Sequence, residues 1–334
     1  MSRARDFADL AGSADAGGLT GKNRIINGGF QVWQRGTSST SDGYQTADRF
    51  QGSSQNGAAT MSQQSFTVGQ TDVPGEPQFY YRHNQTTQAT DYMPNIQHRV
   101  EGVRSLAGQK VTLSVYAKAS KSVALKTYIF QHFGSGGSPS AGVVVENSPT
   151  ISTLTTSWQR VTYTFDMDSI SGKTLGTNGD DYLAVYLQFP TSDTYSVDLA
   201  LLQLEVGEQA TPFEHRSVQD ELLRCQRYFT IVCGNDDNTF TNTHAWTAQE
   251  VIGHLGFGKV EMRTNPTMSK SDNTHFQIRS GGISETSDNV SFVQSNKIGH
   301  CRAEFSGSGG LTTGRGAWVK LNTTSGYIHA DAEL

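Results

Sequence analysis

Apolar and polar side chains alternate along several short segments of this chain, which is the pattern of a β-strand with one buried face. Residues 110–120, KVTLSVYAKAS, place Val111 and Val115 on one face and Tyr116 and Lys118 on the other. The same alternation recurs in residues 122–133, 158–167, 181–189 and 195–205. Strands of this kind must pack sheet against sheet, so the pattern predicts an all-β fold with a jelly-roll β-sandwich.

Composition and one segment with helical periodicity complete this prediction. Only 17% of the residues are charged and 35 of the 334 are glycine, which is typical of an all-β protein with many turns. Residues 217–229, SVQDELLRCQRYF, instead repeat Val218, Leu222 and Cys225 at helical spacing behind a capping Ser217. The sequence therefore predicts a short helix over 217–229, followed by further strand-like segments that form a smaller C-terminal β-domain.

The expected domain organisation has three parts. Residues 23–216 form the jelly roll, and residues 217–334 form the linker helix and the C-terminal β-domain, whose polar, turn-rich strands favour oligomerisation. Residues 1–22 are too few to bury a core of their own. They are either a disordered tail or an arm that orders on a partner, with Phe7 and Leu10 as its apolar anchors.

Several function classes are disfavoured by the sequence. The net charge of −5 and the lack of a Lys/Arg cluster argue against nucleic-acid binding. No apolar run reaches the length of a membrane-spanning helix, so we expect no membrane insertion. No nucleophile elbow, zinc-protease motif, phosphate-binding loop or dinucleotide fingerprint is present, and the histidines lack metal-ligand spacing. We therefore expect a protein that is not an enzyme and needs no cofactor.

A set of motifs in a fixed order carries a family resemblance. They are NRIINGGFQVWQRG, TADRF, LAGQKVTLSVYAKAS, TTSWQRVTYTF, VDLALLQLEVGEQATPFEHRS and ELLRCQRYF, between residues 23 and 230. Together they resemble bacteriophage tail-fibre and related virion proteins, whose jelly roll is similar to carbohydrate-binding modules. In this resemblance, residues 27–36, NGGFQVWQRG, are the first strand and loop of the jelly roll. We expect Trp33 to pack in the core rather than contact a ligand, because a large aromatic side chain near a strand is usually buried.

The resemblance implies a structural protein on the surface of a phage particle, assembled in the bacterial host cytoplasm. Such proteins are often homotrimers that meet a glycan of the host surface, and residues 1–22 would attach this one to other virion proteins. Three alternatives stay open, namely a free carbohydrate-binding module, a polysaccharide-degrading tailspike enzyme and a purely structural decoration protein of the capsid or tail.

A structural calcium ion is also implied by the resemblance. Carbohydrate-binding jelly rolls frequently hold Ca²⁺ between the first strand and an aspartate of the last one, and Asp198 stands in a similar place. The chain departs from that pattern, because Gln31 replaces an acidic residue and Asp198 is single where two aspartates are common. Calcium prefers several oxygen ligands, so these departures weaken the expectation.

Strand alternation predicts a glycan-binding surface on the polar face of the jelly roll. Aromatic and polar side chains recur there, and flat rings with hydroxyl groups can stack a sugar ring and bind its rim. The candidate residues are Tyr116, Lys118, Tyr128, His132, Tyr186 and Gln188. The alternative is that these rings pack under a loop or against a neighbouring subunit.

Overall fold

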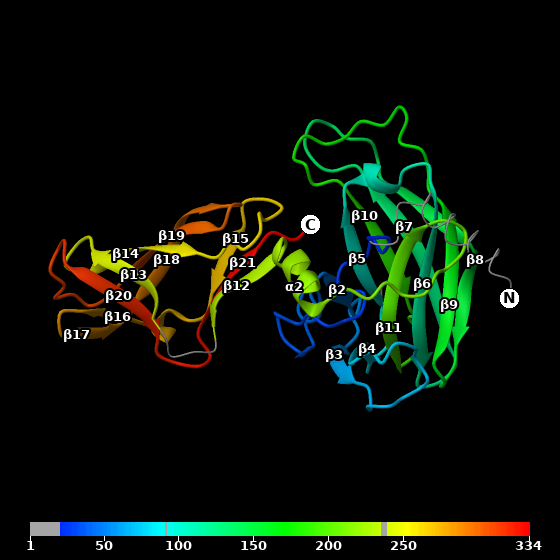
Figure 1. The fold of residues 1–334 in the computed structure, drawn as a ribbon, viewed down its shortest axis with the longest axis horizontal. Helices are drawn as coiled ribbons and strands as arrows, with labels where there is room; N and C mark the ends of the chain where they lie inside the picture. Colours follow the sequence, from blue (N-terminus) through cyan, green and yellow to red (C-terminus); the bar gives the residue numbers. More distant parts are fainter. Residues whose placement is uncertain (1–20, 91, 235–238) are drawn as a thin grey trace. The chain divides into compact units, whose positions relative to one another are not determined.

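The computed structural model describes residues 21–90, 92–234 and 239–334, and their regular structure is almost entirely β. Two compact units follow one another along the chain (Figure 1). The first ends at Glu221 and also includes Leu334, and the second runs from Leu222 to Glu333. The division falls a few residues after the predicted boundary at residue 216, inside helix α2 (Val218–Gln226). Apart from Gly21 and Lys22, the predicted arm of residues 1–22 lies outside the described residues.

The first unit is a sandwich of two antiparallel sheets, which confirms the predicted all-β jelly-roll class. The six-stranded sheet has the order β1 (Ser38–Ser39), β3 (Ala59–Ser65), β4 (Phe79–Gln85), β11 (Tyr195–Val206), β6 (Lys110–Ala119) and β9 (Gln159–Asp166). The five-stranded sheet has the order β2 (Phe50–Ser53), β5 (Asn95–Glu101), β10 (Tyr182–Gln188), β7 (Val123–His132) and β8 (Val143–Leu154). A single 3₁₀ turn, η1 (Val103–Leu106), follows β5.

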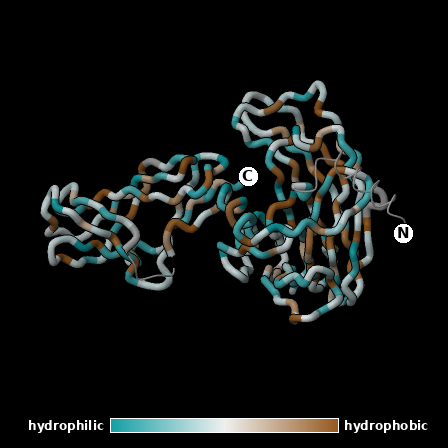
Figure 2. Tube along the Cα trace, in the orientation of Figure 1, coloured by the Kyte–Doolittle hydropathy of each residue, from teal (hydrophilic) through white to brown (hydrophobic). Residues whose placement is uncertain are grey.

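Alternation along the strands builds the core between the two sheets. In β7 every second side chain is buried, and Leu125 and Ile129 are fully enclosed. Val115 and Ala117 of β6 are likewise buried from the other side of the sandwich, so the apolar faces meet as the sequence predicts. Hydrophobic residues line these strands in Figure 2.

The segment expected to be the first strand is not a strand. Residues 22–37 form a turn and extended coil, in which Asn27 and Phe30 adopt positive φ angles of 59° and 52°. The Asn27 amide nitrogen donates to the carbonyl of Val32 at 2.8 Å, and its Oδ1 accepts from the Gln31 backbone at 2.9 Å. This side chain replaces the ladder of a strand, so the expectation of a first strand was wrong here. The Trp33 ring, partly buried, packs on the core.

Helix α2 begins as predicted and ends early. The Ser217 hydroxyl accepts a hydrogen bond from the Asp220 backbone at 3.1 Å, which caps the first turn. The helix ends at Gln226 rather than at residue 229, because Phe229 opens strand β12 (Phe229–Gly234) and pairs with Asp331. A strand partner far along the chain thus overrides the helical spacing of Phe229.

The second unit has its own sheets and its own core. The three-stranded sheet has the order β12, β21 (Tyr327–Asp331) and β15 (Thr267–Lys270). The seven-stranded sheet has the order β17 (Ile283–Thr286), β16 (Phe276–Ser280), β20 (Gly316–Leu321), β13 (Thr239–Ala245), β14 (Glu250–Gly256), β19 (His300–Ser306) and β18 (Asn289–Asn296). A 3₁₀ turn, η2 (Asn273–His275), precedes β16. Phe276 and Phe305, with ring centroids 5.9 Å apart, lie in the core of this unit. Nowhere in the described chain is there a helix with the length and apolar character needed to cross a membrane.

Candidate functional site

Two stacked ring pairs lie on the outward face of the five-stranded sheet. Strand pairing places Tyr186 of β10 opposite Tyr128 of β7, and Tyr182 opposite His132. The Tyr128 and Tyr186 ring centroids are 4.5 Å apart, and so are those of His132 and Tyr182. Because the strands alternate, each of these rings points away from the core that their neighbours fill. We call these four rings the aromatic face.

Polar groups from β5 border the aromatic face. The Gln97 amide donates to the Tyr186 hydroxyl at 2.9 Å, and the Arg99 guanidinium lies 4.5 Å from the centroid of the Tyr182 ring. Arg99 also donates to the backbone carbonyl of Leu334. Flat rings, hydroxyls, an amide and a guanidinium therefore occur together, and this combination can stack a sugar ring and hydrogen-bond its hydroxyl groups.

Burial disfavours ionisation of both stacked tyrosines. It raises the pKa of Tyr128 to about 12, and the neighbouring Tyr186 adds to the effect. Burial also raises the pKa of Tyr186, against a smaller opposing effect from Arg99. At neutral pH both hydroxyls can thus donate as well as accept hydrogen bonds.

The structure brings together only part of the predicted glycan-binding set. Tyr128, His132 and Tyr186 share the aromatic face, and Gln188 lies at the end of the same strand as Tyr186, opposite Lys126. Tyr116 and Lys118 lie on β6, in the other sheet, so the expectation of one common face was wrong for them. Alternation shows which residues point outward. It does not show to which of the two outward faces of the sandwich they belong.

Tyr116 has the packed environment that was the alternative for these rings. It joins a small cluster around Ala200 and Leu201 on the outward face of the six-stranded sheet, together with Phe66, Tyr80, Trp158 and Phe213. The Lys118 ammonium lies 5.1 Å from the centroid of the Trp158 ring. These contacts give Tyr116 a packing role beneath the surrounding loops.

The proposed calcium ligand has protein partners. Asp198 is 3% exposed, and its two carboxylate oxygens accept from Arg82 Nε at 2.6 Å and Nη2 at 2.8 Å. Lys118 Nζ lies 3.7 Å from the same carboxylate. Two cationic side chains compete with any metal there, so the surroundings of Asp198 do not fit a calcium site.

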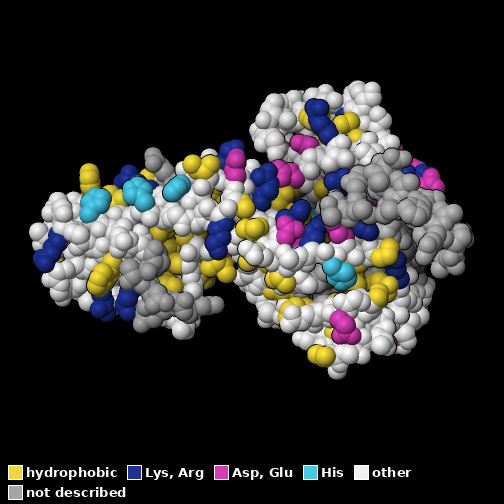
Figure 3. Space-filling view, viewed as in Figure 1, with side chains coloured by type: hydrophobic (Ala, Val, Ile, Leu, Met, Phe, Trp, Pro, Cys, Tyr) yellow, Lys and Arg dark blue, Asp and Glu magenta, His cyan; other side chains and the backbone are white. Residues whose placement is uncertain are grey.

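Histidines are exposed on the C-terminal unit, where Figure 3 shows several on the surface in cyan. His244, His254 and His300 are among the exposed ones. Within the described ranges, no three or more His, Cys, Asp or Glu side chains are grouped so that they could hold a metal ion.

Sequence reasoning missed Tyr182, Gln97 and Arg99. Tyr182 could have been found, because it stands in register with Tyr186 in the same alternating segment. Gln97 and Arg99 lie in β5, whose sequence NIQHRVE alternates weakly, with four consecutive buried residues from Asn95 to His98. Only the pairing of β5 with β10 brings them beside the tyrosines.

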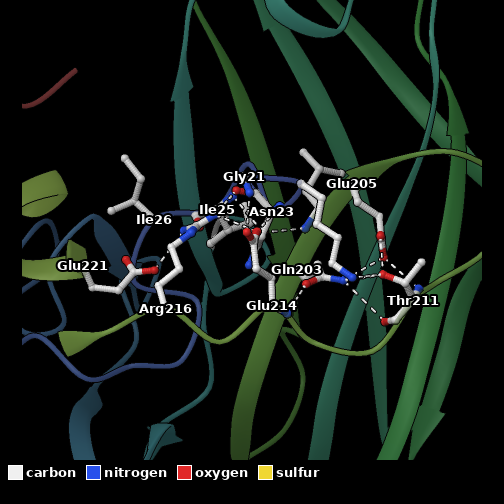
Figure 4. A network of polar contacts seen from close by, with 12 residues as sticks. Gly21, Asn23, Ile25, Ile26, Gln203, Glu205, Thr211, Glu214, Arg216 and Glu221 are labelled. Atoms are coloured by element: carbon white, nitrogen blue, oxygen red, sulfur yellow. Dashed lines mark hydrogen bonds and ion pairs between the residues drawn. The ribbon is translucent and has the colours of Figure 1, made fainter. Parts of the chain in front are cut away.

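Three of the motifs that carry the family resemblance meet in one buried polar network (Figure 4). Arg216 donates to Glu221 at 2.9 Å and to Glu214 at 3.2 Å, while Glu214 accepts from the Asn23 backbone at 2.7 Å. Asn27 completes it by donating its backbone N–H to Glu221 at 2.6 Å. Burial opposes ionisation of Glu214, yet hydrogen bonds from the Asn23 and Gly21 backbones, together with Arg216, lower its pKa.

Comparisons with known proteins give partial structural likeness. No protein-family model matches the chain. No curated protein matches it in sequence. Among solved structures, the N-terminal cellulose-binding domain of β-1,4-glucanase C from Cellulomonas fimi is 16% identical, with a TM-score of 0.33 over 54% of this chain and 100% of that one. The CBM22-1 xylan-binding domain from Paenibacillus barcinonensis is 14% identical, with a TM-score of 0.32 over 52% of this chain and 94% of that one.

A phage protein is also among the similar structures. The enzymatically active domain of tailspike protein 4 from bacteriophage CBA120 is 9% identical, with a TM-score of 0.34 over 56% of this chain and 22% of that one.

Proposed function

We propose that this chain is a structural protein of a bacteriophage particle, a tail fibre or a similar appendage, that adheres to the host by binding a surface glycan. The virion assignment rests on the motifs between residues 23 and 230. The glycan assignment rests on one observation, the two stacked ring pairs of the aromatic face. The bound glycan lies across β10 and β7 and is not cleaved.

The geometry of the aromatic face suits an extended sugar chain. Tyr182, Ala184 and Tyr186 follow one another on the same face of β10. The two tyrosine rings are therefore spaced by about 13 Å along the strand. Two platforms at such a distance can each stack a different sugar residue of one chain. Arg99 stands beside the rings and can bind hydroxyl groups at the edge of the sugars, whereas the buried Gln97 holds the Tyr186 hydroxyl in place.

Binding can be tested by affinity electrophoresis of the full-length protein in gels that contain bacterial lipopolysaccharide or capsular polysaccharide. Tyr186→Ala and Tyr128→Ala are the test variants, and Tyr92→Ala is the matched control, because Tyr92 is 74% exposed outside the aromatic face. We expect the wild type and the control to be retarded, and both test variants to migrate freely. Equal retardation of all four proteins would show that the aromatic face is not the binding site.

Two further measurements separate the remaining function classes. A reducing-end assay after incubation with the retarding polysaccharide would reveal cleavage and would favour the tailspike enzyme. If no polysaccharide retards the wild-type protein, and host-cell adsorption is also absent, the purely structural decoration role is favoured.

The proposed assembly is a homotrimer attached to other virion proteins through residues 1–22. Light scattering of the full-length protein tests the trimer, and a monomer at micromolar concentration would contradict it. Deletion of residues 1–22 should leave a folded protein that is not incorporated into particles. Normal incorporation of the truncated protein would rule out this attachment.

A further inference from the structure

A pocket of about 480 Å³ opens on the seven-stranded sheet of the C-terminal unit. Its lining combines Asn242 of β13, Trp318 of β20 and Arg279 of β16 with the turn between β16 and β17. Strand pairing aligns Asn242 with Trp318 and Trp318 with Arg279, so these three side chains form one row across neighbouring strands. Cross-strand partners share a face, and the pocket therefore presents an amide, an indole and a guanidinium together.

Small residues keep this pocket open. Gly281 and Gly282 have positive φ angles of 56° and 91°, and Gly316 and Ala317 continue the lining on β20. A Cβ atom added at Gly316 would meet no atom within 4 Å, so the space above this residue is empty. A larger side chain at position 316 would fill the pocket without a clash against the protein.

Two arginines give the pocket a positive rim. Arg279 lines it and donates through Nε to Gln277 at 2.9 Å. The Arg315 guanidinium lies directly over Gly281, because a Cβ atom added at Gly281 would be 2.2 Å from the Arg315 Cζ. Among the residues that the structure describes, neither guanidinium pairs with a carboxylate. Trp318 is 46% exposed beside them, which is unusual for so large an apolar side chain.

We infer that this pocket is a second binding site, which takes a carboxylate-bearing pyranose such as a uronic or sialic acid residue of a polysaccharide. The Trp318 indole offers a flat apolar surface for the sugar ring, and the Arg279 guanidinium can bind the carboxylate through two parallel hydrogen bonds. Asn242 can both donate to and accept from ring hydroxyls. The inference is independent of the aromatic face, because every residue of the pocket lies in the other unit.

The test is ¹⁹F NMR of the full-length protein labelled with 5-fluorotryptophan. The chain has four tryptophans, and the Trp318→Phe variant assigns the Trp318 resonance. The probes are methyl β-D-glucuronide, methyl α-sialoside and, as the neutral match, methyl β-D-glucoside. Inorganic phosphate is a further probe, because it would occupy an anion site that has no requirement for a sugar ring.

We expect a saturable shift of the Trp318 resonance with one of the acidic sugars and at least about tenfold weaker binding of the glucoside. Arg279→Lys keeps the charge but loses the paired hydrogen-bond geometry, and should weaken binding by about tenfold. Gly316→Leu should abolish binding by filling the pocket. Lys259→Gln, which removes an exposed charge outside the pocket, should leave binding unchanged.

Three results would overturn the inference. They are the absence of any shift with both acidic sugars, equal affinity for the glucoside and the glucuronide, and displacement of the acidic sugar by phosphate at equal concentration. Thermal melting of Arg279→Lys and Gly316→Leu checks that both are folded. The binding measured here should also persist in Tyr186→Ala, which separates this site from the aromatic face.

Discussion

Tyr128 and Tyr186 stack across neighbouring strands with their ring centroids 4.5 Å apart and an angle of 15° between the ring planes. Rings at this distance and angle lie face to face, so each covers one face of its partner and the pair forms one aromatic surface. The Gln97 amide fixes the Tyr186 hydroxyl at one edge of that surface. Substitutions of Tyr186 can therefore separate the contribution of ring stacking to glycan binding from the contribution of hydrogen bonding.

Tyr186→Phe should keep the stacked surface and remove the hydroxyl that Gln97 binds. We expect glycan affinity to fall by about tenfold or less, which corresponds to one hydrogen bond of about 1 kcal/mol. Tyr186→Ala should lose binding altogether and reduce the free energy of unfolding by about 1–2 kcal/mol, because the ring is half-buried. Affinity electrophoresis and urea unfolding measure the two effects. A Phe variant as defective as the Ala variant would contradict the stacking role.

Tyr128 should titrate well above an ordinary tyrosine. Its pKa is raised to about 12 by burial, compared with 10.0 in the unfolded chain. A raised pKa means that the protonated form is favoured by folding, so this contribution is complete below pH 10 and is lost as the pH rises toward 12. The difference in tyrosinate absorbance between wild type and Tyr128→Phe isolates this group. A midpoint near pH 10 in that difference would show that the ring is not buried as described.

His83 should make the protein sensitive to acid. Burial lowers its pKa to about 4, from 6.5 in the unfolded chain, although the hydrogen bond with Gln85 opposes the shift. A lowered histidine pKa means that the unfolded chain takes up the proton first, so stability is lost as the pH falls from 6.5 to 4. The loss should reach about 3 kcal/mol.

The measurement is urea unfolding of wild type and His83→Gln at a series of pH values. The variant cannot take up this proton, so its stability should depend less on pH in that window than that of the wild type. Parallel curves for the two proteins would assign the acid sensitivity to other groups, such as the buried His98.

Arg216→Ala should destabilise the first unit strongly. Arg216, Glu214 and Glu221 are at most 10% exposed, and the variant would leave two buried carboxylates without their shared cation. The expected loss is about 3–5 kcal/mol of unfolding free energy. Lys121→Ala is the control, because Lys121 and Asp193 form an ion pair that is about half-exposed. Thermal melting should show a large decrease for Arg216→Ala and almost none for the control, whereas equal small decreases would mean that the network contributes little.

The sequence predicted which residues face the core far better than it predicted which strands are neighbours. Alternation placed Val115 and Ala117 inside and Tyr128 and Tyr186 outside, since orientation depends only on the period of the strand. The assignment of β6 to a different sheet from β7 and β10 depends on long-range pairing, which leaves no local pattern. Tyr116 was therefore placed on the wrong face by a correct reading of its own strand.

Local polar chemistry explains the other departures. The segment around Asn27 contains strand-forming residues, but its backbone groups are bound by the Asn27 side chain rather than by a neighbouring strand. The motifs that include Asn23, Arg216 and Glu221 could be recognised from the sequence, whereas their contact became visible only in the fold. The motifs thus pointed to these residues, but they did not show that the residues form a buried polar network.

The position of Glu221 has a consequence for the exchange of modules between genes. Glu221 is a residue of helix α2, yet its carboxylate binds Arg216 and the Asn27 backbone of the jelly roll. A recombination that joined a new C-terminal domain directly after residue 216 would discard this carboxylate and leave Arg216 buried with one acidic partner fewer. Viable chimaeras should therefore inherit the beginning of the helix together with the sandwich, and the crossover point should lie after residue 221.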